Sequence, residues 1–206
     1  MSDGVAARLA RQTGIRRVPS RHIELFVVPQ FIDPATCAAL VERIDRQRRP
    51  SEIADDHGEA GFRTSETCDL DGSDPLVERV ERAIADLLGL DLGASEPMQG
   101  QRYSLGQEFR PHTDTFEPGG HDYFLNCAEA GNRTWTAMAY LNAVDAGGGT
   151  RFKEIGKIIQ PVMGTVLAWN NLSPDGSPNP ATLHQGMKVR KGAKYIITLW
   201  YRANPR

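Results

Sequence analysis

The sequence predicts a mainly β fold with supporting α-helices, a double-stranded β-helix (jelly roll) with N-terminal helices packed on one sheet. Two observations predict it. From about residue 98 the chain consists of short extended segments separated by Gly, Pro and Asn, and two amphipathic helix patterns precede them. Such a succession is typical of a double-sheet fold whose helices cover one face. We expect residues 22–97 (strand and supporting helices) and 98–206 (double-stranded β-helix core) to form one compact domain.

The elements before the core are justified by their end signals. Residues 1–21, with five arginines against one acid, are expected to be a loose N-terminal arm or a short helix, with an organelle transit peptide as the alternative. Residues 22–31 are expected to form a strand. Helices are expected at 33–47 and 74–89, since each begins with Asp-Pro, an N-cap followed by proline at the first helical position. The second helix ends at a glycine suited to a C-terminal cap.

Eight segments of the core have the alternation or the β-branched and aromatic content of strands. They lie at 98–106, 108–114, 134–142, 150–152, 157–160, 164–170, 183–189 and 194–202. Two long polar loops, 115–133 and 170–181, interrupt them. The first loop directly follows His112 and Asp114, where a loop that covers a bound substrate would be useful.

Composition excludes several classes of protein. The formal net charge of −2 argues against a broad nucleic-acid-binding surface, with a local basic patch as the alternative, and no apolar run approaches the roughly 20 residues of a membrane helix. Three scattered cysteines, Cys37, Cys68 and Cys127, suggest neither a disulfide framework nor a metal knuckle. We therefore expect a reducing, cytoplasmic location, without a nucleic-acid or membrane partner. The sequence does not indicate an oligomeric state.

A histidine and an acid stand two positions apart in the strand-like segment 108–114. Residues i and i+2 of a strand project from the same face, so His112 and Asp114 point the same way. Two polar side chains on one buried face are costly unless something binds them. The pair therefore predicts a metal site that needs a third ligand.

The third ligand is sought among the remaining histidines. His22, His57 and His121 lie in segments with loop composition, whereas His184 opens a strand-like segment. Taken alone, His184 fits a ligand and a buried core histidine equally well. Two histidines and one carboxylate would bind a metal on one face and leave positions open, which is typical of non-haem Fe(II) oxygenases and not of closed structural zinc sites.

A lysine in the last strand bears on the same site. Lys194 shares a strand face with Ile196, Thr198 and Trp200. If that face looks inward, the ammonium is buried beside the metal and needs an anion. The alternative is an ordinary surface lysine on an edge strand.

The chain resembles a known family over about 99–202, and more weakly from residue 23. "RYSLGQEFRPHTD" is similar to the Tyr-x-x-Gly-x-x-aromatic-x-x-His-x-Asp block of the prolyl 4-hydroxylase branch of the Fe(II)- and 2-oxoglutarate-dependent oxygenases. "YLNAVDAGGGTRF", "HQGMKVRKGAKYIITLWYR" and "FRTSETCDL" resemble further blocks, in the same order. Two departures are Met187, where proline is usual, and Phe109, where many members have tyrosine.

The resemblance implies roles for individual residues. His112, Asp114 and His184 would hold the iron. Lys194 would pair with the far carboxylate of 2-oxoglutarate. Further residues would line the cosubstrate pocket, namely Tyr103, Tyr140, Thr198 and Trp200, although Tyr103, Tyr140 and Trp200 also fit ordinary core positions. Arg133 matches a position that contacts the peptide substrate in the oxygen-sensing prolyl hydroxylases.

The implied activity is hydroxylation of a C–H bond with Fe(II), 2-oxoglutarate and O2, ascorbate serving as a reductant, and with release of succinate and CO2. A prolyl residue in a peptide or protein is the expected substrate. The same cofactors acting on a free amino acid, a small metabolite or an alkylated base form the nearest alternative. A non-oxidative zinc- or manganese-dependent cupin enzyme, and a non-catalytic protein on a retired enzyme fold, are the others.

Overall fold

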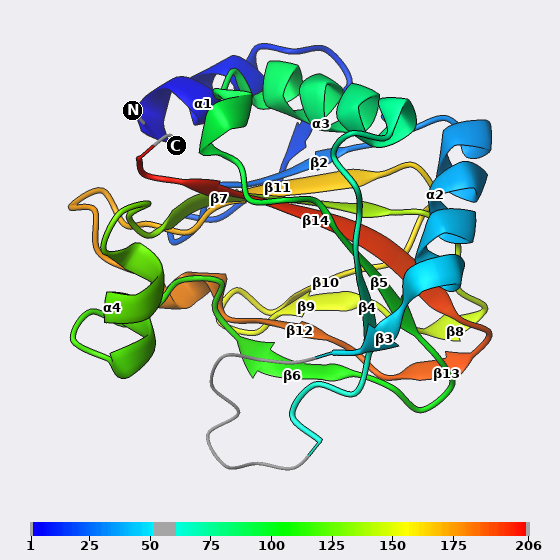
Figure 1. The fold of residues 1–206 in the computed structure, drawn as a ribbon. Coiled ribbons are helices and arrows are strands. Elements are labelled where there is room, and N and C mark those ends of the chain that lie inside the picture. The colour runs from blue at the N-terminus through cyan, green and yellow to red at the C-terminus, as the bar shows by residue number, and fades with distance from the viewer. Residues whose placement is uncertain (1, 52–60, 205–206) are drawn as a thin grey trace.

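A computed structural model describes residues 2–51 and 61–204, so that His57 lies outside the described residues. Two β-sheets face each other, and three N-terminal helices lie on the outer side of the larger sheet (Figure 1). The mainly β fold with helices on one sheet is thus confirmed. Strands from residues 22–97 and from 98–206 pair within the larger sheet, so the supporting layer and the core share one structure.

All neighbouring strands are antiparallel. The larger sheet has the order β1 (Arg16–Arg17), β2 (Leu25–Val28), β11 (Val166–Asn170), β7 (Arg133–Tyr140), β14 (Lys194–Arg202), β5 (Gln99–Tyr103), β4 (Glu66–Asp69) and β3 (Arg49–Pro50). The smaller sheet has the order β10 (Lys157–Ile159), β9 (Thr150–Phe152), β12 (His184–Gly186) and β6 (Phe109–His112). A short ribbon pairs β13 (Val189–Lys191) with β8 (Ala146–Gly147).

The helices end where their sequences predict. Helix α2 (Pro34–Gln47) is capped by Asp33, which accepts a hydrogen bond from the Thr36 backbone N–H. Helix α3 (Pro75–Leu88) is capped by Asp74 and stops at Gly89, whose φ of 69° lies in the left-handed region that glycine adopts without strain. None of the helices in the described part of the chain has the length and apolarity to cross a membrane.

The larger sheet has two differently used faces. Alternate residues of β14, Ile197, Leu199 and Tyr201, pack with the helices, whereas Ile196 belongs to a second core between the sheets. Lys194 shares the inner face with Ile196, as strand alternation requires. One side of the sheet therefore supports the fold, and the other faces the site.

The N-terminal segment is more ordered than a loose arm. Residues Ser2–Ala10 form helix α1, which packs against α3, with Val5 and Leu9 buried. Spacing of i and i+4 places these apolar residues on one helix face. Arg8 donates to the Asp86 and Leu87 carbonyls at the end of α3, so one of the five arginines has a structural role.

Two expectations about the core are wrong in detail. The segment 115–133 contains a short helix, α4 (His121–Cys127), where we expected only a loop. The segment 183–189 is not one strand. It divides into β12, paired with β6 and β9, and β13, paired with β8, because the chain changes partners near Met187.

Candidate metal and cosubstrate site

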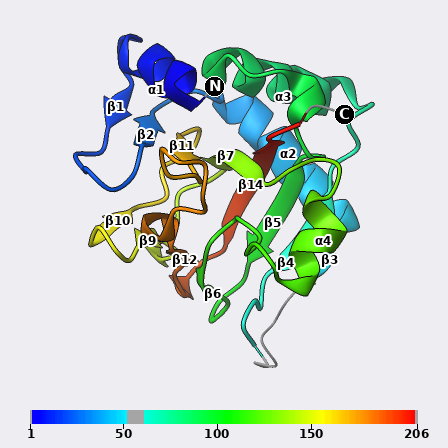
Figure 2. The ribbon, with the colours of Figure 1, turned by 90° about the vertical axis from the view of Figure 1, so that its left-hand side faces the viewer.

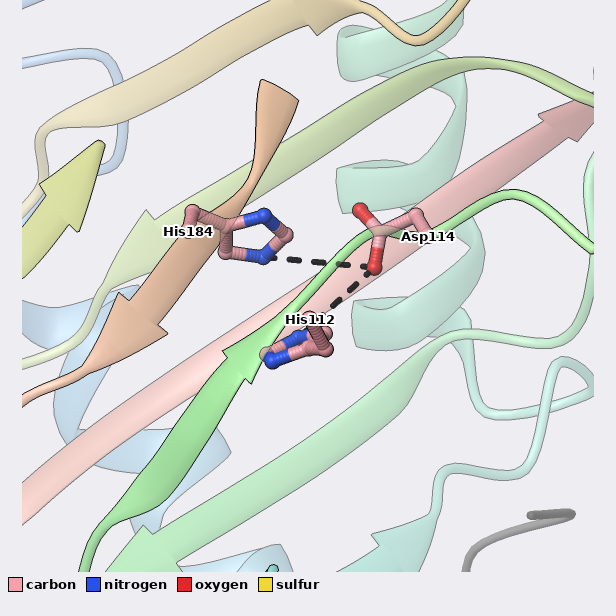
Figure 3. Close-up of side chains that lie close together, drawn as sticks. All are labelled: His112, Asp114 and His184. Carbon is pink, nitrogen blue, oxygen red and sulfur yellow. Dashed lines mark ion pairs between the residues drawn. The ribbon is translucent and has the colours of Figure 1, made fainter. Parts of the chain in front are cut away.

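Three side chains converge at one end of the smaller sheet. His112 is the last residue of β6, Asp114 follows two residues later, and His184 opens β12. Strands β6 and β12 pair with His184 directly opposite His112. The potential ligand atoms all lie within 4.8 Å of one another, and each histidine Nε2 is 4.0 Å from Asp114 Oδ1 (Figure 3). Strand pairing therefore joins the predicted third ligand to the other two.

Backbone carbonyls orient both imidazoles. His112 Nδ1 lies 2.8 Å from the Arg110 carbonyl oxygen, and His184 Nδ1 lies 2.9 Å from that of Thr182. Because a carbonyl oxygen only accepts, each Nδ1 carries the proton and each Nε2 presents its lone pair to the site. This is the arrangement in which metal-binding histidines are usually held.

The charges in the site suit a divalent cation. Burial, followed by the neighbouring His184, lowers the pKa of His112 to about 3, so this imidazole is neutral near pH 7. Burial alone would raise the pKa of Asp114, but the adjacent His184 and His112, then Arg133, outweigh it and lower that pKa. The site thus offers an ionised carboxylate beside imidazole nitrogens, a donor set that suits Fe(II).

Aromatic rings fix the positions of the histidines. The His112 ring stacks on Phe109, with 3.5 Å between ring centroids. The His184 ring lies 5.7 Å from Phe152 and 5.0 Å from Trp169. These contacts exclude water from the sides of both ligands and limit their rotation. Phe109, which departs from the tyrosine usual in the family, serves here as a stacking surface.

Lys194 opens into the same cavity as the three ligands. Its residue exposure is only 1%, and its ammonium forms no ion pair or hydrogen bond with any residue in 2–51 or 61–204. The Tyr103 and Tyr140 ring centroids lie 5.0 Å and 5.5 Å from its Nζ. Burial lowers the pKa of Lys194 to about 7. A buried ammonium without an acidic partner fits a site that receives an anion, so the residues present fit 2-oxoglutarate.

Of the four other residues expected around the cosubstrate, three line the cavity. Tyr103, Thr198 and Trp200 line the cavity. Tyr103 donates to Gln101 Oε1 at 2.9 Å, and Gln101 Nε2 donates to Thr198 Oγ1 at 3.4 Å. Tyr140 donates its hydroxyl proton to Thr150 Oγ1, a cavity residue, at 2.7 Å, and its contact with the cosubstrate stays a prediction.

Arg133 is engaged within the protein. Its Nε and Nη2 lie 2.6 Å and 2.7 Å from the two carboxylate oxygens of Glu96, a bidentate pair. The guanidinium carbon also lies 4.1 Å from the Trp200 ring centroid, and Nη1 donates to the Asp114 carbonyl oxygen at 3.3 Å. Arg133 thus borders the metal site, and a role in substrate binding stays a prediction.

Sequence reasoning missed several residues of the site. Gln101 lies two positions before Tyr103 on β5 and so shares its face, a signal that strand alternation offered. Thr150 stands in the "GGGTRF" block that carried the resemblance, although no role was assigned to it. Met138 and Trp169 line the cavity from β7 and β11. Thr136, which donates to Asp114 Oδ2, gave no sequence signal, since its partner lies 22 residues away.

Comparison with known proteins agrees with this geometry. Residues 98–202, about half of the chain, match the family described as the 2OG-Fe(II) oxygenase superfamily. The chain is 35% identical to prolyl 4-hydroxylase subunit alpha-1 of Gallus gallus over 142 residues and 33% identical to the Homo sapiens protein over 159 residues. These matches cover 68% and 77% of this chain but 27% and 30% of the relatives. The chain thus spans less than a third of their length.

Solved structures share the fold. A viral collagen prolyl hydroxylase from Paramecium Bursaria Chlorella virus-1, in complex with 2OG, has a TM-score of 0.69 at 22% identity, covering 90% of this chain and 97% of that one. A Pseudomonas putida prolyl-4-hydroxylase has a TM-score of 0.62 at 19% identity, covering 98% and 99%. A Trichoplax adhaerens prolyl hydroxylase, in complex with a hypoxia inducible factor peptide fragment, has a TM-score of 0.65 at 16% identity, covering 98% and 88%.

The family match, the relatives and the converging ligands lead to one conclusion. The chain belongs to the 2OG-Fe(II) oxygenase superfamily, in its prolyl 4-hydroxylase-like branch.

Proposed function

We propose that this protein is an Fe(II)- and 2-oxoglutarate-dependent dioxygenase that hydroxylates a prolyl residue in a peptide or protein. The observation that carries the proposal is the cavity that His112, Asp114, His184 and Lys194 share. A metal site alone fits many reactions. A buried ammonium that has no partner among the described residues fits a cosubstrate with a second carboxylate and has no use in a non-oxidative cupin enzyme.

The residues of the chain divide the work. The two imidazoles and Asp114 would hold Fe(II), and Lys194 would bind the far carboxylate of 2-oxoglutarate. When bound, Fe(II), 2-oxoglutarate and O2 supply the oxidising chemistry, in which one oxygen atom enters a C–H bond and the other enters succinate as CO2 leaves. The apolar walls of the cavity, including Met138 and Trp169, exclude water from the reacting groups.

A polypeptide substrate is supported by two observations. The relatives similar in sequence are prolyl 4-hydroxylase subunits, and one structure of similar fold holds a peptide fragment. In addition, a groove of about 560 Å³ is lined partly by residues that neighbour the metal ligands in the sequence. It reaches Thr113, which stands between two ligands, and Leu183, which precedes the third. The groove shares no lining residue with the metal cavity, but a volume of this size has room for an extended stretch of polypeptide.

The test is turnover of 2-oxoglutarate with proline-containing peptides, Fe(II) and ascorbate. We expect succinate to form and mass spectrometry to show a gain of one oxygen atom on proline. The Lys194→Met variant should lose about 30-fold or more in affinity for 2-oxoglutarate, because truncating a buried charge pair costs roughly 2–5 kcal/mol. Asp114→Asn, which removes the charged ligand, should lower the affinity for Fe(II) and the rate of succinate formation.

The alternatives give different results. Succinate formation with a free amino acid or metabolite, and none with peptides, would show a dioxygenase with the same cofactors and a small-molecule substrate. No turnover, together with unchanged 2-oxoglutarate binding in Lys194→Met, would exclude the dioxygenase. In that case zinc or manganese retained by the purified protein would favour a non-oxidative cupin, and absence of any bound metal would favour a non-catalytic protein.

A further inference from the structure

Two polar side chains lie fully buried behind Asp114. Thr136 belongs to β7, and Asn171 directly follows β11, the strand that pairs with β7. Both residues are 0% exposed. Thr136 Oγ1 lies 2.7 Å from Asp114 Oδ2, and Asn171 Nδ2 lies 2.8 Å from Thr136 Oγ1. The three side chains form one hydrogen-bonded chain that ends at the carboxylate.

The direction of these hydrogen bonds follows from the chemistry of the groups. An ionised carboxylate only accepts, so Thr136 must donate its single hydroxyl proton to Asp114 Oδ2. The Thr136 oxygen can then only accept from Asn171, whose amide nitrogen only donates. Asn171 therefore holds the threonine hydroxyl in the orientation that serves Asp114.

The two oxygens of Asp114 thus have different surroundings. Oδ1 is the atom 4.0 Å from the Nε2 of both His112 and His184, and Oδ2 is the atom bound by Thr136. We propose that Thr136, held by Asn171, is a positioning residue that keeps Asp114 a ligand through one oxygen only. The coordination position that Oδ2 would otherwise take stays available to the cosubstrate. This inference rests on the proposed function, which requires open positions on the metal.

The local structure argues against a merely structural role for the amide. Asn171 Oδ1 is buried and has no hydrogen-bond partner within the described part of the chain. A buried polar atom without a partner lowers stability, so an apolar side chain at this position would suit the core better. The backbone of Asn171 is fixed on both sides, donating to the Thr134 carbonyl oxygen at 2.7 Å and accepting from the Asn179 N–H at 2.9 Å. This rigid anchor suits a side chain that must hold its partner in one orientation.

The experiment compares Thr136→Val, which has nearly the same shape without the hydroxyl, with Thr136→Ser, which keeps it. Thr134→Val is the matched control, because Thr134 lies on the same strand and its hydroxyl bonds the Tyr201 carbonyl oxygen away from the ligands. Each variant is loaded with Co(II), whose visible spectrum reports coordination number and geometry. Affinity for 2-oxoglutarate is measured on the same samples by titration calorimetry.

We expect Thr136→Val to change the Co(II) spectrum and to weaken 2-oxoglutarate binding about tenfold or more. Thr136→Ser and Thr134→Val should stay within about twofold of the wild-type protein. Asn171→Ala should act in the same direction as Thr136→Val but less strongly, because Thr136 keeps its hydroxyl and loses only its fixed orientation. Asn171→Ala also provides the test if Thr136→Val does not fold, as judged by circular dichroism and thermal melting.

The inference is overturned if Thr136→Val keeps the wild-type spectrum and affinity, or if Thr134→Val changes them equally. Wild-type behaviour of Asn171→Ala would likewise overturn the part assigned to the amide. These failures differ from failure of the proposed function, since in that case the metal-loaded wild-type protein would itself not bind 2-oxoglutarate.

Discussion

At the scale of single residues, the buried ammonium of Lys194 lowers the stability of the ligand-free fold. Its ammonium lies in the core between the sheets, 1% exposed and without an acidic partner among the residues described. Desolvation lowers its pKa from 10.5 to about 7. An unfolded chain would hold the proton up to its ordinary pKa, so burial of this charge opposes folding below that pH. A bound carboxylate would remove the penalty, which couples ligand binding to stability.

The lowered pKa of Lys194 predicts that the free energy of unfolding depends on pH. Between pH 7 and 10.5 the unfolded Lys194 is protonated and the folded one is not, so the stability of the ligand-free protein should rise with pH in this window. Lys194→Met should therefore be more stable than wild type by a few kcal/mol at pH 6, and the difference should shrink towards pH 10. Urea unfolding of both proteins at several pH values measures it.

Binding should show the opposite trend. Since 2-oxoglutarate selects the protonated lysine, its affinity for the wild-type protein should be flat below about pH 7 and fall by up to tenfold per unit above it. A wild-type affinity that stays constant from pH 6 to 9 would contradict the pairing of Lys194 with the cosubstrate.

At the scale of elements, the fit between α2 and the larger sheet depends on one glycine. A Cβ on Gly100 of β5 would lie 2.4 Å from Ile44 Cγ1 of α2, well inside contact distance. Ile44 is itself fully buried and belongs to the core between the helices and the sheet. The helix can approach the strand only because this position lacks a side chain.

We therefore expect Gly100→Ala to lower the free energy of unfolding by roughly 1–3 kcal/mol through overpacking. Gly4→Ala is the matched control: Gly4 lies in helix α1, where an added methyl group would meet no atom within 4 Å, so alanine there should raise stability by up to about 1 kcal/mol. Ile44→Ala removes both atoms that the added Cβ would meet, Cγ1 and Cδ1, so it should cost less stability in the Gly100→Ala background than alone, which urea unfolding of the double variant would show. Unchanged stability of Gly100→Ala would mean that α2 shifts freely on the sheet.

At the scale of the whole molecule, three chain segments meet around the groove of about 560 Å³. The turn after β6, the turn after β9 and the segment before β12 border the groove described above, and Figure 2 shows these strands with α4 beside them. The charged residues lining the groove are Glu117 and Glu154, both exposed. Neither forms an ion pair with a residue in the described ranges. A basic side chain in the proposed peptide substrate would meet complementary charge here.

We therefore expect peptides with Lys or Arg close to the target proline to react faster than matched peptides with Glu. The double variant Glu117→Lys, Glu154→Lys should lose or reverse this preference, changing the ratio of kcat/KM values roughly two- to tenfold, as suits exposed charges. The effect should fade at high ionic strength. Glu42→Lys on α2 is the control, and an equal change in that variant would argue against the groove.

Local sequence signals predicted much of this protein because they act over a few residues. The caps Asp33 and Asp74 and the stop at Gly89 stand where predicted, since each depends on a bond within its own helix end. The boundaries of the small strands were less accurate, because strand ends depend on which partner is present. Localisation and the alternative interpretations of the N-terminal arginines remain predictions.

The sequence by itself determined which residues share a face. Strand alternation placed Lys194 with Thr198, because side-chain direction follows from the backbone alone, and it predicted the convergence of His112 with Asp114 although β6 ends at His112. Only the tertiary structure decided between the two interpretations of His184, through the pairing of β12 with β6. The tertiary structure also revealed the ion pair of Arg133 with Glu96 and the hydrogen bonds that link Asn171 to Asp114 through Thr136. Such contacts join segments far apart in the chain, and the packing of whole sheets, rather than any local pattern, brings them together.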